Sequence, residues 1–234
     1  MSFTKADIRA GVRGNLGDPG GLTDQDIDQH IGEAIFAYSK LVPNYKVTDL
    51  TGDGSAYDFS LPSDFQLGFS SIVSIEFPAN EQVPTYLADT SWILYQNTTT
   101  TKFRFLLTPG NGEIARIAYT VPHSIDADDA SLTTVIDADR VAIEYLTTAR
   151  AAEELAAEAT RLSVGTNSDI PFLPAPVASY RLLAQDYLRM YYEHMDIPAD
   201  GGSPGLSLTG SLSNIPSWGS RGLVREQPNP LPFN

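Results

Sequence analysis

Apolar residues recur with a helical period in two segments near the start of the chain. A Thr followed three residues later by an Asp precedes each segment, at Thr4–Asp7 and at Thr23–Asp26, which is the pattern of a helix N-terminal capping box. The glycine-rich stretch 17–21 separates the two segments. We predict a short helix over residues 5–15 and a longer helix over residues 24–41, whose apolar face is formed by Ile27, Ile31, Ala34, Ile35, Tyr38 and Leu41.

From Tyr45 to Val121 the pattern changes to the alternation that is typical of half-buried strands. Glycine-containing turns at residues 52–54 and 109–112 predict two β-hairpins. Residues 92–95 fit either a strand or a helical turn. We predict an antiparallel module of about five strands, over residues 45–50, 57–61, 71–77, 102–107 and 113–119.

A helical period returns after an acidic connector at residues 126–131. Asp137 is the expected N-cap of an alanine-rich helix over residues 138–162, and a further helix is expected over residues 177–195. Three tyrosines on that last helix have helical spacing, which favours packing in the core or against another subunit over the stacking of bases or sugars. These candidate contact residues are Tyr187, Tyr191 and Tyr192.

The fold class predicted from these patterns is α+β: a small helical bundle with an inserted antiparallel β module and an extended C-terminal arm. Residues 1–44 and 123–199 supply the helices of the bundle, residues 45–122 form the inserted module, and residues 200–234 form the arm.

The arm combines six Gly, five Pro and six Ser with widely spaced large apolar side chains. Ordering it costs about 35–70 kcal/mol at roughly 1–2 kcal/mol per residue. Burial of about 1,400–2,800 Å² of apolar surface would offset that cost at roughly 25 cal/mol per Å². The arm as a whole has no periodic face on which to pack alone, so we expect it to bind the surface of another molecule. The expected partner-binding residues are Leu206, Leu208, Leu212, Ile215, Trp218, Leu223, Leu231 and Phe233.

The amino-acid composition excludes several classes of function. The chain has no Cys, which excludes disulfide scaffolds, thiolate zinc sites and cysteine nucleophiles. We expect no membrane span and no secretory signal. A net charge of −14 argues against a broad phosphate-binding face, whereas an acidic wall would let nucleic acid slide past without binding.

The candidate reactive residues form no strong constellation. His30 and Glu33 have ligand-like spacing on one helix, but no further ligands match them. Residues 49–60 resemble a calcium-binding loop except that the twelfth position is Ser60 rather than a bidentate Glu, so a turn is the better interpretation. We therefore expect no enzyme activity, no catalytic residues, no metal and no cofactor.

Several runs resemble the head–tail adaptor (connector, or head-completion) proteins of tailed bacteriophages. In these proteins a helix that ends in a Tyr-Ser-Lys element precedes a β insertion. The runs in this chain that carry the resemblance are Ala34–Pro43, Leu50–Gly54, Leu61–Phe65, Gly68–Pro78 and the helix start at Asp137–Arg140.

The resemblance implies a structural protein of the virion neck. Such adaptors form an oligomeric ring, generally a dodecamer, which docks beneath the portal protein at the capsid vertex and presents a platform to the tail or nozzle protein. DNA passes through the ring without specific binding, and terminal arms grip the portal or a neighbouring subunit. It also implies assembly in the host cytoplasm and no contact with a membrane.

Two alternatives stay open at this stage. A tail or baseplate protein could use the β module to bind a partner or a glycan through exposed aromatic residues, namely Tyr86, Trp92 and Tyr95. A hydrolase could use the carboxylates Asp49, Asp53 and Asp58 for acid–base chemistry.

Overall fold

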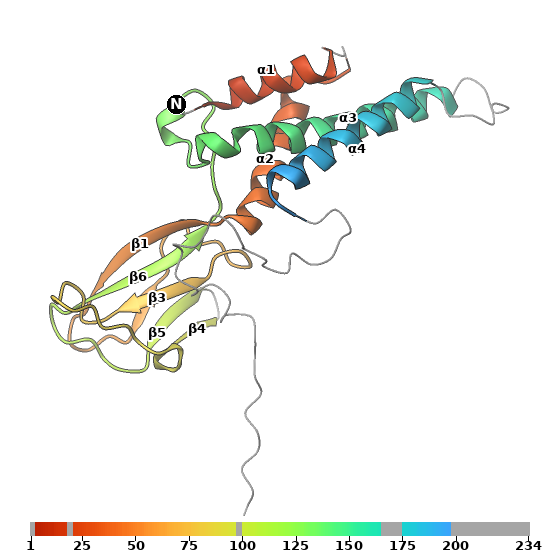
Figure 1. Cartoon of the computed structure of the whole chain (residues 1–234). Helices are drawn as coiled ribbons and strands as arrows, with labels where there is room; N and C mark the ends of the chain where they lie inside the picture. The colour runs from red at the N-terminus through yellow and green to blue at the C-terminus, as the bar shows by residue number, and fades with distance from the viewer. Residues whose placement is uncertain (1–2, 18–20, 97–99, 165–174, 198–234) are drawn as a thin grey trace, which may run out of the picture. The chain divides into compact units, whose positions relative to one another are not determined.

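The computed structural model describes residues 3–17, 21–96, 100–164 and 175–197 (Figure 1). It is an α+β protein, as the sequence predicts, and its described residues form two compact units. The helical unit takes the described residues of 1–46, 64–70 and 120–204, and the β unit takes those of 47–63 and 71–119. The arm lies outside the described residues, and so do all eight partner-binding residues expected on it.

Helices α1 (Lys5–Leu16) and α2 (Asp24–Leu41) begin at the two expected capping boxes. In each box the Thr side chain accepts a hydrogen bond from the backbone of the Asp, and that Asp side chain accepts one from the Thr backbone, at 2.8 Å in both cases. These local bonds satisfy amide groups that lack partners in the first turn of a helix. Both helix predictions are confirmed.

Helices α3 (Arg140–Val164) and α4 (Ala175–His194) complete the helical unit and pack along each other (Figure 1). Small side chains on α3 let neighbouring helices approach closely, because Ala142, Ala151 and Ala152 are all fully buried. The largest fully buried side chains of this core are those of Tyr38 and Phe3, followed by Ile8, Ile27, Ile31, Ile143 and Val12.

The expected N-cap at Asp137 is wrong. Residues Asp137–Asp139 form a short 3-10 helix that follows Ile136, and no side chain caps it. Asp139 instead accepts a hydrogen bond from the Tyr38 hydroxyl at 2.6 Å and lies 3.3 Å from Nε2 of His194. Contacts with α2 and α4 therefore fix this turn. Such contacts cannot be predicted from the local sequence.

The β unit contains two three-stranded sheets. The first has the order β1 (Asn44–Thr51), β6 (Ile114–Val121), β3 (Ile72–Glu76), and the second has the order β2 (Asp58–Ser60), β5 (Thr101–Phe105), β4 (Trp92–Gln96). Its core is formed by Ile75, Phe103, Phe105, Ala115, Ile117 and Tyr119. The predicted strand at 71–77 is confirmed, and residues 92–95 prove to be a strand.

Both predicted hairpins are wrong, because the strands on either side of each turn belong to different sheets. The two turns instead pack against each other: the Gly52 amide donates to the Glu113 carbonyl at 2.8 Å, and the Gly112 amide donates to the Gly52 carbonyl at 2.9 Å. Asp53 then accepts bonds from the amides of Ser55 and Ala56, so the chain turns away from β1 toward the second sheet.

Candidate functional site

The three carboxylates considered for hydrolysis or calcium binding are engaged in structural contacts. Asp49 pairs with Arg116 at 2.9 and 3.0 Å, and Asp53 caps its own turn. Asp58 accepts two bonds from Arg104, at 2.6 and 2.8 Å, which hold the pKa of the Asp58 carboxyl at about 2. A general acid needs a raised pKa, so Asp58 is unsuited to that role.

The histidines are also bound to partners within the fold. His30 meets Glu154 at 2.6 Å, whereas Glu33, its expected companion, accepts a bond from Arg150 at 3.0 Å. His123 lies against Thr134, and burial lowers the pKa of its imidazole. Within the described ranges no group of three or more acidic or histidine side chains could hold a metal ion. Nor is any helix there long and apolar enough to cross a membrane.

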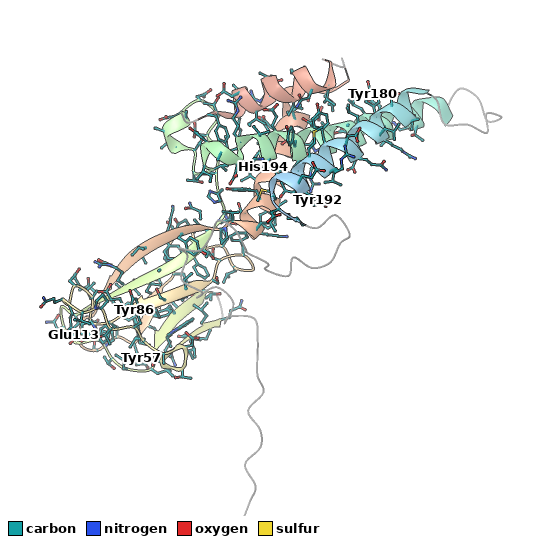
Figure 2. The ribbon with its side chains drawn as sticks, in the orientation of Figure 1. Tyr57, Tyr86, Glu113, Tyr180, Tyr192 and His194 are labelled. Atoms are coloured by element: carbon teal, nitrogen blue, oxygen red, sulfur yellow. The ribbon has the colours of Figure 1, made fainter. Side chains whose placement is uncertain are left out.

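A groove of about 770 Å³ lies in the helical unit, and we call it the α2–α4 groove. Its wall is largely apolar even though it is open to solvent, with Phe36 exposed at 43% and Leu41 at 37%. Tyr192 of α4, labelled in Figure 2, also lines it. Phe36 and Leu41 are the kind of apolar surface that proteins cover by binding another molecule.

Two buried polar atoms at the α2–α4 groove have no hydrogen-bond partner among the described residues, namely the Tyr191 hydroxyl and Nε of Arg150. Tyr191 is only 3% exposed, and burial raises the pKa of its hydroxyl to about 12. A neutral hydroxyl can both donate and accept a hydrogen bond. An unsatisfied buried polar group costs about 1–3 kcal/mol, so these two atoms lower the stability of the protomer itself.

The C-terminal end of α4 lies at this groove. The Met195 amide donates to the Tyr191 carbonyl at 3.0 Å, and the Ile197 amide donates to the Tyr192 carbonyl at 2.9 Å. These bonds close the end of α4 and place Ile197 in the groove wall. Ile197 is the last described residue of the chain.

The three tyrosines singled out on α4 have different surroundings. Tyr191 belongs to the buried core, Tyr192 packs beside it with ring centroids 5.6 Å apart, and Tyr187 packs on Tyr145 at 5.7 Å. Tyr187 and Tyr192 keep partly exposed surface that another subunit could contact. The subunit-contact role of the three residues remains a prediction.

The aromatic residues considered for glycan binding do not share one surface. Trp92 packs on Phe103 on the inner face of its sheet, with ring centroids 5.7 Å apart. Tyr95 points to the opposite face, where its hydroxyl donates to Asp58 at 2.7 Å. Tyr86, which is 51% exposed, lies beside β3 in the other sheet. A stacking platform needs neighbouring rings on one face.

Sequence reasoning missed the groove itself. Phe36 was the available signal, because it lies outside the apolar stripe that α2 directs to the core and yet is large and apolar. Tyr191 is a candidate contact residue in the sequence, but its position near Arg150 and Phe36 has no sequence signal, because it depends on the packing of α3 against both α2 and α4.

Comparisons with known proteins find similarity to solved structures. No protein-family model matches the chain, and no curated protein matches it. A solved structure described as "Neck of empty GTA particle computed with C6 symmetry" aligns at 16% sequence identity over 80% of this chain and 88% of that chain, with a TM-score of 0.28. A TM-score of that size does not establish a common fold.

Proposed function

We propose that this chain is a structural virion protein of the neck. In this role it forms a ring that joins the portal vertex of the capsid to the tail and surrounds the channel through which DNA passes. The ring, which the family resemblance puts at about a dozen copies, contacts the portal protein on one side and a tail or nozzle protein on the other. The chain is assembled in the host cytoplasm, acts in the virion, and carries no enzymatic role.

The α2–α4 groove is the observation that carries the proposal. A folded protomer that stayed alone would leave Phe36 and Leu41 partly exposed to water. Full burial of a large apolar side chain stabilises a protein by about 1.5–3 kcal/mol. Because Phe36 and Leu41 are only partly buried, each contributes only part of this free energy while the groove is open. A neighbouring copy that covers the groove recovers this energy, which favours assembly.

The net charge of the chain favours a role in lining the DNA channel over a role in binding nucleic acid. Each copy carries −14, so DNA is repelled from the wall and is not held by it. The same charge makes copies repel one another, so the contacts between them must be apolar or hydrogen-bonded. Salt screens that repulsion, and we therefore expect more assembly at high ionic strength.

Electron microscopy of the purified chain, alone and mixed with portal rings, tests this function. We expect rings with a central hole, in greater yield at high ionic strength or on the portal. Variants Phe36→Ser and Leu41→Ser should lose rings, and the matched control Leu182→Ser should keep them, because Leu182 is 63% exposed and lies outside the groove. A chain that stays monomeric at high concentration and does not bind portal rings would refute the proposal.

A further inference from the structure

Among the described residues, no strand pairs with the outer edge of β4 in the second sheet. Exposed edge strands are usually blunted by charges, proline, bulges or shortness, because unpaired backbone groups invite another strand. The other edges follow that rule: β1 carries Lys46 and Asp49, β3 carries Glu76, and β2 has three residues. Strand β4, Trp-Ile-Leu-Tyr-Gln, has no charge and no proline, and among the described residues it pairs with β5 alone.

The apolar layer of this sheet is open at β4. Trp92 lies opposite Phe105 and Leu94 lies opposite Phe103, so these residues share the inner face of the sheet. Phe103 and Phe105 are each 1% exposed, whereas Leu94 is 38% exposed. The core is therefore closed on the β5 side of Leu94 and uncovered on its outer side, where one further strand would fit.

The opposite face of the same edge is polar. Ile93 and Tyr95 of β4 lie opposite Arg104 and Lys102 of β5. The Arg104 guanidinium lies 4.5 Å from the Tyr95 ring and also bonds to Asp58, which makes this face a network of satisfied polar groups. A strand that pairs with β4 must therefore be apolar on one side and polar on the other.

One segment of the arm has this pattern. No period holds over the whole arm, but residues 206–212 read Leu-Ser-Leu-Thr-Gly-Ser-Leu, so that leucines and polar residues fall on opposite sides of an extended chain. The segment has no charge and no proline, which would remove a ladder hydrogen bond. It is also as long as an ordinary strand.

We propose that residues 206–212 of a neighbouring copy add to β4 as the fourth strand of the second sheet. The leucines then continue the inner layer beyond Leu94, and Ser207, Thr209 and Ser211 lie on the side of Ile93 and Tyr95. This pairing is β-augmentation, in which backbone hydrogen bonds give affinity and alternate side chains give specificity. It rests on the proposed ring, which brings identical copies side by side.

The length of the arm permits the exchange. Leu206 is nine residues beyond Ile197, which corresponds to a reach of up to about 30 Å at roughly 3.3 Å per residue. The radius of gyration of a 200-residue body is about 16–17 Å. Residues 198–205 therefore let the segment extend about 30 Å beyond the last described residue, and the exchange requires the β4 strand of a neighbouring copy to lie within that distance.

Because the chain has no native Cys, cysteine cross-linking provides a direct test. Full-length Ile93→Cys is mixed under mild oxidation with separately purified Ser207→Cys, Thr209→Cys or Ser211→Cys, and covalent dimers are measured on a non-reducing gel. At least one pair should form a dimer, because facing residues of paired strands fall within disulfide distance. Leu208→Cys should give none, since it faces the other side. Val47→Cys is the matched edge control, because it is 60% exposed on β1.

Each other outcome overturns the proposed strand exchange. Equal cross-linking by Val47→Cys would mean non-specific contact, and dimers of Ile93→Cys with itself would mean that two β4 edges pair with each other. A disulfide that forms only when both cysteines are on one chain would assign the segment to its own copy. The same samples are viewed by electron microscopy: rings without cross-links refute the strand exchange alone, whereas the absence of rings refutes the proposed function.

Discussion

Replacing Gly52 with alanine tests the contact between the two turns that separates the sheets of the β unit. A Cβ added at Gly52 would lie 2.5 Å from the Gly110 carbonyl oxygen and 2.7 Å from Cβ of Pro109. The nearest obstacle is backbone, so a change of side-chain rotamer cannot relieve it. The turns must separate, and the two hydrogen bonds that Gly52 makes with Glu113 and Gly112 weaken with them.

The expected loss of stability follows from three contributions. Overpacking costs about 1–3 kcal/mol. The two weakened backbone hydrogen bonds are worth about 1 kcal/mol each. Alanine reduces the conformational freedom of the unfolded chain, which raises the free energy of unfolding by about 0.4–1 kcal/mol. We therefore expect Gly52→Ala to lower the free energy of unfolding of the β unit by about 2–4 kcal/mol.

Fluorescence of Trp92 during urea unfolding measures this change. The chain has two Trp residues, so the measurement is made in a Trp218→Phe background, where Trp92 reports on the β unit alone. Gly14→Ala is the matched control: nothing lies within 4 Å of the added Cβ, and alanine favours the helix over glycine by about 1 kcal/mol. It should leave the Trp92 transition unchanged or raise stability. An unchanged urea midpoint in Gly52→Ala would refute the packing of the two turns.

Three further predictions concern charge, the groove and the arm. Arg104 lowers the pKa of Asp58 in the folded state to about 2, so this pair stabilises the fold above the unfolded pKa of about 3.9, and the contribution is lost as pH falls toward 2. Between pH 5 and 2 the Trp92 unfolding midpoint should therefore fall less steeply in Asp58→Asn than in the parent chain. Tyr191→Phe should raise the thermal midpoint of the monomer, because it removes a buried hydroxyl that has no partner among the described residues. A large loss of monomer stability would reveal a partner for the hydroxyl within the protomer. Deleting the residues after Asp200 should leave the circular dichroism of the body unchanged and weaken assembly in sedimentation velocity, whereas unfolding would mean that the arm completes its own core.

Local signals explain what the sequence predicts well. The helices that begin after Thr4 and Thr23 follow from capping bonds between residues three apart, and these bonds form whatever surrounds them. The strand at 72–76 follows from alternation within five residues. Each of these features depends on neighbours along the chain, so the residues themselves carry enough information to place it.

The pairing of the strands and the position of the candidate site could be established only from the tertiary structure. Gly52-Asp53-Gly54 has the composition of a hairpin turn, yet its contact with the turn at 109–112 sends the next strand to another sheet. The groove joins Phe36 to Arg150 and Tyr191, which lie far apart in sequence. The sequence alone determined where most helices and strands form, because those choices rest on bonds and patterns among near neighbours, whereas it left residues 92–95 open. Which strands pair, and which apolar surfaces stay open, depended on contacts between distant segments that only the folded chain brings together.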